Sequence, residues 1–250
     1  MAAYDFTAPR LFVEADLAEG RVLPLERAQA NYLLTVLRRA EGEPVLLFNG
    51  RDGEWRAEIV PQGRKSADLR VVAQTRPQPR PADLHYLFAP LKSGRLDYMA
   101  QKAVEMGAGR LQPVFTRFTQ GERIKLDRLQ ANAIEAAEQC GILSVPEIGE
   151  PDRLPACLGA LEPERLLVFC DEDAPVTDPV AALRGAADPA KPPPLAVLVG
   201  PEGGFHPEER ALIAARPNTV ALSLGPRILR ADTAAVAVLA LVQAVLGDAR

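Results

Sequence analysis

The chain has 250 residues, of which 48% are hydrophobic and 25% charged, and its formal net charge is −4. This composition is typical of a globular protein with a hydrophobic core. No stretch holds about 18 consecutive apolar residues, which excludes a membrane-spanning helix. The first residues carry acids where a signal peptide has a basic start, so we expect a cytoplasmic protein.

The cysteines and histidines argue against a metal site. Cys140, Cys157 and Cys170 are odd in number, widely spaced and never in a CxxC pair, and only His85 and His206 accompany them. Zinc sites need clustered ligands at short spacing, and a disulfide framework needs an even number of cysteines. We therefore expect reduced thiols and no bound metal.

The charges are unevenly distributed along the chain. Residues 86–130 carry 8 basic against 4 acidic side chains, whereas residues 131–250 carry 9 against 17. Nucleic-acid binding depends on a local basic face rather than on the total charge, so the basic middle of the chain is a candidate RNA-binding region. A solvated helix surface is the alternative interpretation.

The first part of the chain has the pattern of a small β-barrel. Short β-rich runs are separated by turn residues, and one amphipathic segment, 27–39, interrupts them. The predicted strands are residues 11–13, 21–26, 45–48, 54–60 and 67–73. A barrel closes its own sheet edges, which suits a module of this size. We expect this domain over residues 1–75.

A proline-rich stretch, TRPQPRPAD, predicts a linker over residues 76–82. From residue 83 to 250 strands alternate with helices, and the later strands are wholly apolar, as in a mainly parallel sheet covered on both faces. Helices are predicted near 95–106, 126–140 and 233–246. The last of these is apolar nearly all round, so it is expected to be buried in the core or against a partner subunit.

Two loops leave apolar strands through a Gly-Pro step. The first lies in LVGPEGGF (198–205) and the second in LSLGPRILRADTA (222–234). Ligands of open α/β sheets bind at the carboxyl ends of parallel strands, so these two loops predict a pocket. The loops match neither the dinucleotide nor the triphosphate glycine pattern, and Glu202 would repel a phosphate.

A nucleoside with a positive centre and no phosphate suits such loops, and S-adenosylmethionine has this chemistry. Plain tight turns are the alternative interpretation. After the first loop, HPEE predicts a helix start with His206 as the cap and Pro207 in the first turn, rather than a catalytic histidine. Asp232 and Thr233 are predicted to cap the last helix.

These motifs resemble the ribosomal RNA small-subunit methyltransferase E family of the SPOUT superfamily. The resemblance rests on the two loop motifs and also includes PRLFV, YLLTVLRRAEGEPVLLFNG, KSGRLDYMAQKAVEMG and EAAEQCGILSVPEI, so it covers essentially the whole chain. It implies a PUA-like β-barrel that binds RNA and a SPOUT domain with a deep C-terminal trefoil knot. It also implies a homodimer without metal or membrane contact.

The activity implied by the resemblance is S-adenosylmethionine-dependent methylation of uridine N3 in 16S rRNA of the small ribosomal subunit. Three positions depart from the family pattern, namely Asn31, Ile142 and Asp232, and these concern RNA contacts more than the cofactor site. Two alternatives stay open. The chain could methylate another RNA position, including a ribose 2′-O, or it could bind RNA without catalysis.

The candidate site residues follow from this chemistry. As the N3 proton leaves, negative charge spreads onto the flanking carbonyl oxygens, and a fixed guanidinium there stabilises the transition state. The catalytic candidates are Arg230 and Arg227. The cofactor-binding candidates are Leu198, Gly200, Glu202, Gly203, Leu224, Gly225, Ile228 and Leu229. The candidate RNA phosphate contacts are Arg10, Arg38, Arg39, Lys92, Arg95, Lys102 and Arg117.

Overall fold

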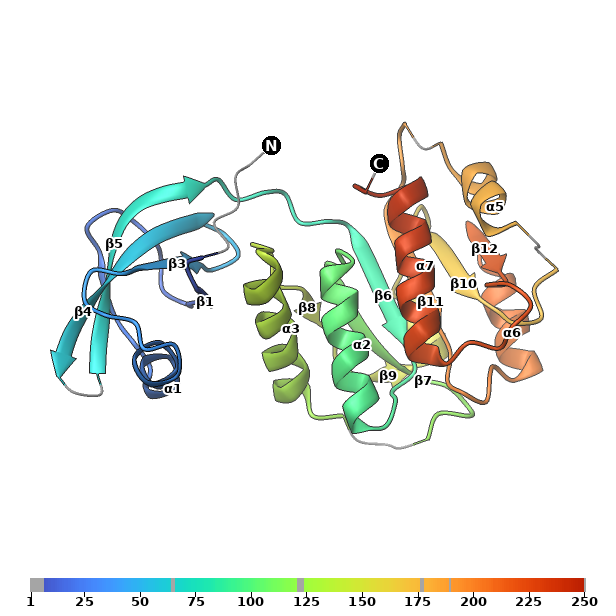
Figure 1. Cartoon of the computed structure of the whole chain (residues 1–250). Helices are drawn as coiled ribbons and strands as arrows, with labels where there is room; N and C mark the ends of the chain where they lie inside the picture. The colour runs from blue at the N-terminus through green and yellow to red at the C-terminus, as the bar shows by residue number, and fades with distance from the viewer. Residues whose placement is uncertain (1–6, 64–65, 121–123, 176–177, 189, 250) are drawn as a thin grey trace. The chain divides into compact units, whose positions relative to one another are not determined.

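The structure is a computed structural model that describes the chain except residues 1–6, 64–65, 121–123, 176–177, 189 and 250. Part of the argument against a signal peptide concerns residues 1–6, outside the described ranges. The chain divides into two compact units (Figure 1). The first contains Met1–Pro81 and Ile134–Val145, and the second contains Ala82–Ala133 and Pro146–Arg250. Among the described residues, no helix has the length and hydropathy needed to span a membrane.

The first unit is built on a five-stranded sheet in the order β1-β3-β4-β5-β2. Its strands are β1 (Arg10–Phe12), β2 (Val22–Pro24), β3 (Pro44–Phe48), β4 (Glu54–Gly63) and β5 (Ser66–Arg76). β1 runs parallel to β3, and the other pairs are antiparallel. All five predicted strands are therefore present, with bounds that differ by a few residues.

Alternation along β4 explains which face of this sheet is buried. Ala57 and Ile59 are buried, whereas Arg56 and Glu58 between them are more exposed. Side chains two residues apart lie on one face of a strand, so the apolar set of β4 meets those of β3 and β5 in one hydrophobic cluster. Trp55 packs against the edge of that cluster.

The predicted helix over 27–39 is shorter than expected. The regular helix α1 covers Arg27–Asn31, and a wider π-helical turn, η1, covers Tyr32–Val36. The Leu37 N–H donates to the carbonyl of Tyr32, five residues back, at 2.9 Å. Arg38 then takes a positive φ of 54°, which ends the helical path.

The second unit contains a seven-stranded sheet in the order β12-β10-β11-β6-β7-β8, with β9 paired to β7. Its strands are β6 (Leu84–Phe88), β7 (Arg110–Phe115), β8 (Glu147–Ile148), β9 (Asp152–Arg153), β10 (Leu166–Cys170), β11 (Leu195–Val199) and β12 (Thr219–Leu222). Each of these described pairs is parallel, as the apolar runs predicted.

Helices cover both faces of this sheet. They are α2 (Ser93–Glu105), α4 (Leu154–Gly159), α5 (Pro179–Ala186), α6 (Pro207–Ala214) and α7 (Ala231–Val245). A further helix, α3 (Leu126–Cys140), begins in the second unit, and its residues from Ile134 onward belong to the first. α4 and α6 share a hydrophobic cluster with one face. α7 lies beside α2 and also contacts α5 and β11 (Figure 1). This packing buries Val238, Leu239 and Val242, so the predicted burial of the last helix is confirmed.

One polar contact fixes the end of α2 against α7. Gly107 follows the C-cap of α2 with φ of +80°, a left-handed conformation that commonly ends a helix. The Gln243 side-chain amide of α7 donates to the carbonyl of Met106 at 2.7 Å. A Cβ at position 107 would overlap that amide, so glycine is needed for both the φ angle and the approach of α7.

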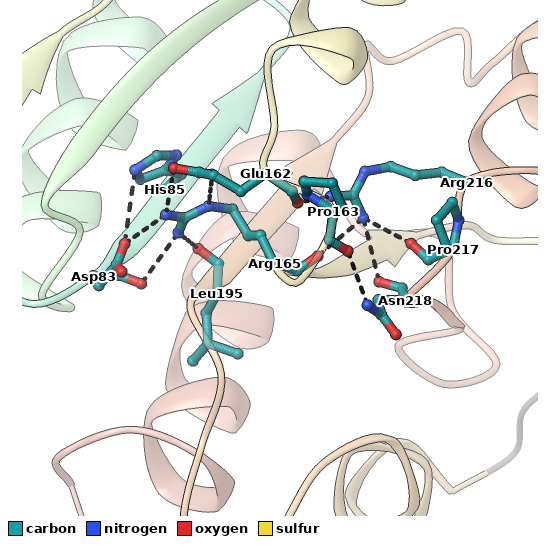
Figure 2. Close-up of polar contacts among 9 residues, drawn as sticks. All are labelled: Asp83, His85, Glu162, Pro163, Arg165, Leu195, Arg216, Pro217 and Asn218. Atoms are coloured by element: carbon teal, nitrogen blue, oxygen red, sulfur yellow. Dashed lines mark hydrogen bonds and ion pairs between the residues drawn. The ribbon is translucent and has the colours of Figure 1, made fainter.

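Arg165 ties together the amino ends of three neighbouring strands (Figure 2). It directly precedes β10 and is only 2% exposed. Its guanidinium donates to the carboxylates of Glu162 and Asp83, both at 2.7 Å, and to the carbonyl of Leu195 at 2.9 Å. Asp83 precedes β6 and Leu195 begins β11. The same guanidinium lowers the pKa of Glu162 to about 2.

A second arginine extends this network to β12. The Arg216 guanidinium donates to the carbonyls of Arg165 at 2.9 Å and Glu162 at 2.7 Å. Asn218, just before β12, donates to the carbonyl of Pro163 at 2.9 Å (Figure 2). The amino ends of four parallel strands are therefore held by side chains rather than by loop packing alone.

We predict that Arg165→Met lowers the free energy of unfolding by about 3 kcal/mol, because it removes the buried partner of two carboxylates and a carbonyl. Both carboxylates are about half exposed and can be rehydrated, which keeps the loss at the low end of the range for buried pairs. Urea unfolding followed by circular dichroism measures it. Arg184→Met, at an exposed arginine of the same unit, is the control and should change stability by less than about 0.5 kcal/mol.

Candidate functional site

A pocket of about 260 Å³ lies at the carboxyl ends of three neighbouring strands, β12, β10 and β11. It is formed by three segments, which we call the first loop (200–206), the second loop (223–230) and the acidic loop (171–175), together with the start of α7. Its lining residues are Cys170, Asp171, Glu172, Val199, Gly200, Pro201, Glu202, Gly203, Gly204, Phe205, Leu222, Ser223, Leu224, Gly225, Arg227, Ile228, Leu229, Ala231 and Ala234.

The first loop folds back over its own phenylalanine. Phe205 is 5% exposed and packs edge-on against Phe169 of β10, with ring centroids 5.0 Å apart. A Cβ on Gly200 would overlap the Phe205 ring. Gly204 has φ of +69°, a conformation that favours glycine. The glycines therefore allow a turn tight enough to return Phe205 to the core while leaving the backbone at the pocket.

The second loop leads directly into α7. Gly225 has φ of +98°, and Ala231 and Ala234 of the helix line the pocket. The predicted cap is wrong in detail, because α7 begins two residues earlier than expected and Arg230 is its N-cap residue. Asp232 lies in the first turn, where a carboxylate favours the positive end of the helix dipole.

The acidic loop is a feature that the sequence interpretation missed. Asp171, Glu172 and Asp173 all pair with Arg210 of α6, at 2.6, 2.9 and 2.5 Å. The sequence shows three consecutive acids directly after a buried strand. It does not indicate that their partner is Arg210, which lies 37 to 39 residues later. Burial raises the pKa of Asp171. It also raises the pKa of the Cys170 thiol to about 12, which makes this cysteine a poor nucleophile.

The charged groups of the lining do not suit a phosphate. They are three carboxylates (Asp171, Glu172 and Glu202) and one guanidinium, that of Arg227. Glu202, a predicted cofactor residue, lines the pocket and pairs with Arg95 of α2. An organic cation surrounded by backbone groups fits this lining better than an anion does.

Most of the predicted cofactor residues come together here. Seven of them line the pocket, namely Gly200, Glu202, Gly203, Leu224, Gly225, Ile228 and Leu229. Leu198 does not line it, because its side chain is fully buried in the cluster that includes α4 and α6. Because this strand is buried on both faces, its sequence has no polar alternation, and the direction of the Leu198 side chain could not be predicted from it.

The two candidate catalytic arginines take different positions. Arg227 is exposed and lines the pocket. Arg230 is also exposed, but it is the N-cap of α7 and is absent from the lining. The structure therefore favours Arg227 over Arg230 for contact with a ligand in the pocket.

In the first unit, one candidate RNA contact needs correction. Arg10 is 7% exposed, and its guanidinium donates to Glu54 at 2.9 Å in a buried ion pair. Arg10 is thus a core residue rather than a surface phosphate contact. Arg38 is exposed. Arg39 is half-buried and donates to the carbonyl of Thr7 at 2.8 Å.

In the second unit, Lys92 is exposed and Arg95 is committed to Glu202. Lys102 pairs with Glu105 at 2.8 Å and lies over the ring of Tyr98. Arg117 is exposed, with its guanidinium near the ring of His206 and 3.3 Å from Glu208. The predicted structural role of His206 is confirmed: it is the N-cap of α6, Pro207 is the first residue of the helix, and Glu208 and Glu209 lie in the first turn.

Comparison with known proteins adds to this geometry. The family described as an RNA methyltransferase domain matches residues 78–243, and the RNA methyltransferase PUA domain matches residues 25–72. The chain is 31% identical to ribosomal RNA small subunit methyltransferase E of Synechocystis, over 96% of this chain and 78% of that protein. It is 29% identical to the Rickettsia conorii protein of the same name, over 94% of each chain.

Solved structures agree with the sequence matches. The ribosomal RNA small subunit methyltransferase E of Neisseria gonorrhoeae, bound to S-adenosyl methionine, has a TM-score of 0.85 and 25% identity, covering 96% of this chain and 99% of that one. A Legionella pneumophila protein in complex with SAM has a TM-score of 0.82 and 29% identity, covering 95% and 97%. The fold is thus a PUA-like domain with a mainly parallel α/β methyltransferase domain. The chain belongs to the ribosomal RNA small subunit methyltransferase E family.

Proposed function

We propose that this protein methylates N3 of a uridine in 16S rRNA of the small ribosomal subunit, with S-adenosylmethionine as the methyl donor. The observation that carries the proposal is the pocket, which brings both Gly-Pro loops and seven of the eight candidate cofactor residues to one edge of a parallel sheet. Relatives named for small-subunit rRNA methylation match nearly the full chain, and a related structure holds S-adenosyl methionine.

The residues present fit this cofactor. The lining combines backbone of glycine-rich loops with the apolar side chains of Leu224, Ile228 and Leu229, and it lacks the cluster of cations that a polyphosphate needs. Asp171 and Glu172 place negative charge where a cationic ligand gains from it. When bound, S-adenosylmethionine supplies an electrophilic methyl group.

The chain's own contribution to catalysis is orientation and electrostatics. The loops would bind the methyl donor, orient it toward the attacking nitrogen and exclude water from the site. Arg227 lies at the pocket, where its guanidinium stabilises charge on the uracil carbonyl oxygens as N3 is deprotonated. Arg230 is the second candidate donor from the same loop.

For the substrate, we assign RNA binding to a PUA-like domain over residues 1–75, a linker over 76–82 and catalysis to residues 83–250. Residues 77–83 contain neither helix nor strand, in keeping with a linker. Arg38, Arg39, Lys92 and Arg117 are the proposed phosphate contacts. The protein acts in the cytoplasm, where ribosomal subunits are its substrate.

The assembly proposed with this function is a homodimer with a C-terminal trefoil knot. Ile228 of the second loop is 93% exposed although it borders the pocket, and a partner subunit would cover it. A mass of one chain in sedimentation velocity would contradict the dimer. A 2′-O or other RNA target and a non-catalytic RNA-binding protein are the alternatives.

Deleting the gene should remove N3-methyluridine from 16S rRNA, as measured by mass spectrometry of its nucleosides, and the wild-type gene should restore it. Persistence of N3-methyluridine with loss of another modified nucleoside would favour the alternative target. Calorimetry measures S-adenosylmethionine binding and serves as the control. A protein that binds RNA but not S-adenosylmethionine would match the non-catalytic alternative.

Replacing Arg227 with alanine should lower kcat about 100-fold, because one charge-stabilising donor supplies about 3 kcal/mol to a transition state. Arg230→Ala should cause a smaller decrease, since Arg230 lies outside the pocket lining. Single-turnover methylation with saturating donor measures both. Arg184→Ala is the control at an exposed arginine, and undiminished turnover in Arg227→Ala would exclude the assigned role.

RNA affinity should fall steeply as salt rises, since each phosphate contact releases counterions. Arg38→Ala and Lys92→Ala should each lower the slope of log affinity against log salt by about 1. Filter binding at salt concentrations from about 50 to about 300 mM measures the slope of log affinity against log salt. A slope near zero for the wild type would rule out these phosphate contacts.

A further inference from the structure

Phe118 is an exposed aromatic side chain at the same sheet edge as the pocket. It lies in the segment that follows β7, and β7 ends at the edge where β6 and β11 also end. Its side chain is 43% exposed. A single exposed apolar side chain is common on protein surfaces, so the case for a binding surface rests on the turn that holds this ring and on its place beside the pocket.

The turn that carries Phe118 is held in place by several hydrogen bonds. The backbone N–H of Thr116 donates to the Thr119 hydroxyl at 2.9 Å, and the Thr119 N–H donates to the carbonyl of Thr116 at 3.2 Å. The N–H of Arg117 donates to the Glu209 carboxylate of α6 at 2.8 Å. The ring is therefore presented by an ordered turn and not by a loose loop, which lowers the entropy cost of binding.

This turn lies directly against the first loop. The Phe118 Cβ is 3.2 Å from the position of a Cβ added to Gly203, so glycine permits the close approach. A small hollow between the two segments shares Pro201, Glu202 and Gly203 with the pocket, and Phe118 and Lys92 line it from the other side. Phe118 thus borders the space that adjoins the proposed cofactor.

The surroundings of the ring favour a nucleic-acid base over an apolar partner. The Phe118 and His206 rings are steeply inclined to each other, with centroids 6.1 Å apart, and the Arg117 guanidinium lies 3.0 Å from the same imidazole. Lys92 is exposed and lines the same hollow as Phe118. An aromatic face flanked by cations has the chemistry that binds an unpaired base by stacking and its phosphates by charge.

We propose that Phe118 stacks on an unpaired base of the RNA substrate and so places the target uridine at the first loop. This inference rests on the proposed function for the identity of the substrate. It adds a substrate-contacting residue outside the cofactor pocket, and it assigns to the turn at 116–119 the positioning of the base rather than the binding of the donor.

The test uses the full-length protein and a single-stranded oligouridine RNA with 2-aminopurine next to its central uridine. Stacking quenches 2-aminopurine fluorescence, so binding to the wild type should lower the signal. Phe118→Leu keeps an apolar side chain but removes the aromatic face, and it should weaken RNA affinity about 10- to 100-fold and abolish the quenching. Phe118→Tyr should retain both.

Controls separate stacking from folding and from the proposed reaction. Leu212→Ala removes a side chain that is 42% exposed on α6 and should leave RNA affinity unchanged. Calorimetry should give the same S-adenosylmethionine affinity for Phe118→Leu as for the wild type, which excludes misfolding. Equal RNA affinity and quenching in Phe118→Leu and the wild type would overturn the stacking role and leave the proposed function intact. A wild type that binds and quenches the oligouridine but transfers no methyl group to small ribosomal subunits would reject the proposed reaction alone.

Discussion

The parallel direction of the central strands is the constraint on which the site depends. β12, β10 and β11 are neighbours in the sheet although β11 lies between the other two in sequence, and all three point the same way. Their carboxyl ends therefore meet at one edge, and three loops that begin at residues 171, 200 and 223 become the walls of one pocket. An antiparallel neighbour would send one loop to the opposite edge and open the pocket. The same argument places the turn with Phe118 at this edge, because it follows the parallel strand β7.

The two edges of the sheet differ in their contacts and in their roles. At the amino ends, Arg165 and Arg216 bind backbone carbonyls, and Arg165 also binds two half-exposed carboxylates, so this edge is held by directional contacts. At the carboxyl ends, glycines and prolines leave backbone groups accessible, which binds a ligand but contributes less to stability. A rigid scaffold at one edge lets the other be built from side-chain-poor loops. In the first loop, Gly200 makes room for Phe205, Gly204 takes a positive φ, and Gly203 permits the close approach of Phe118.

Sequence patterns were sufficient for the elements but not for long-range partners. Apolar runs predicted the parallel strands, because burial on both faces leaves no polar alternation, and the paired Gly-Pro steps predicted the pocket. Because the same runs have no alternation, the direction of the Leu198 side chain could not be predicted, and in the structure it is buried in the core. Arg10 was misassigned because its partner Glu54 is 44 residues away and belongs to another strand. The Arg210 contacts to the acidic loop were missed for the same reason. A charged side chain gives no local sign of whether it is paired, so surface roles are the least predictable from sequence.

Charge pairing around the pocket explains how one site can accept a cation while its protein binds a polyanion. Glu202 pairs with Arg95, and the three carboxylates of the acidic loop share Arg210, so the carboxylates are held in place and part of their negative charge is offset. Within the described lining, Arg227 is the one cationic side chain, and it lies on the second loop rather than among the acids. Local carboxylates act over a few ångströms on a bound donor, whereas their effect on RNA phosphates farther away is reduced by the paired arginines and screened by salt. The arginine partners therefore do more than stabilise two loops, because without them the acids that favour the donor would also repel the RNA.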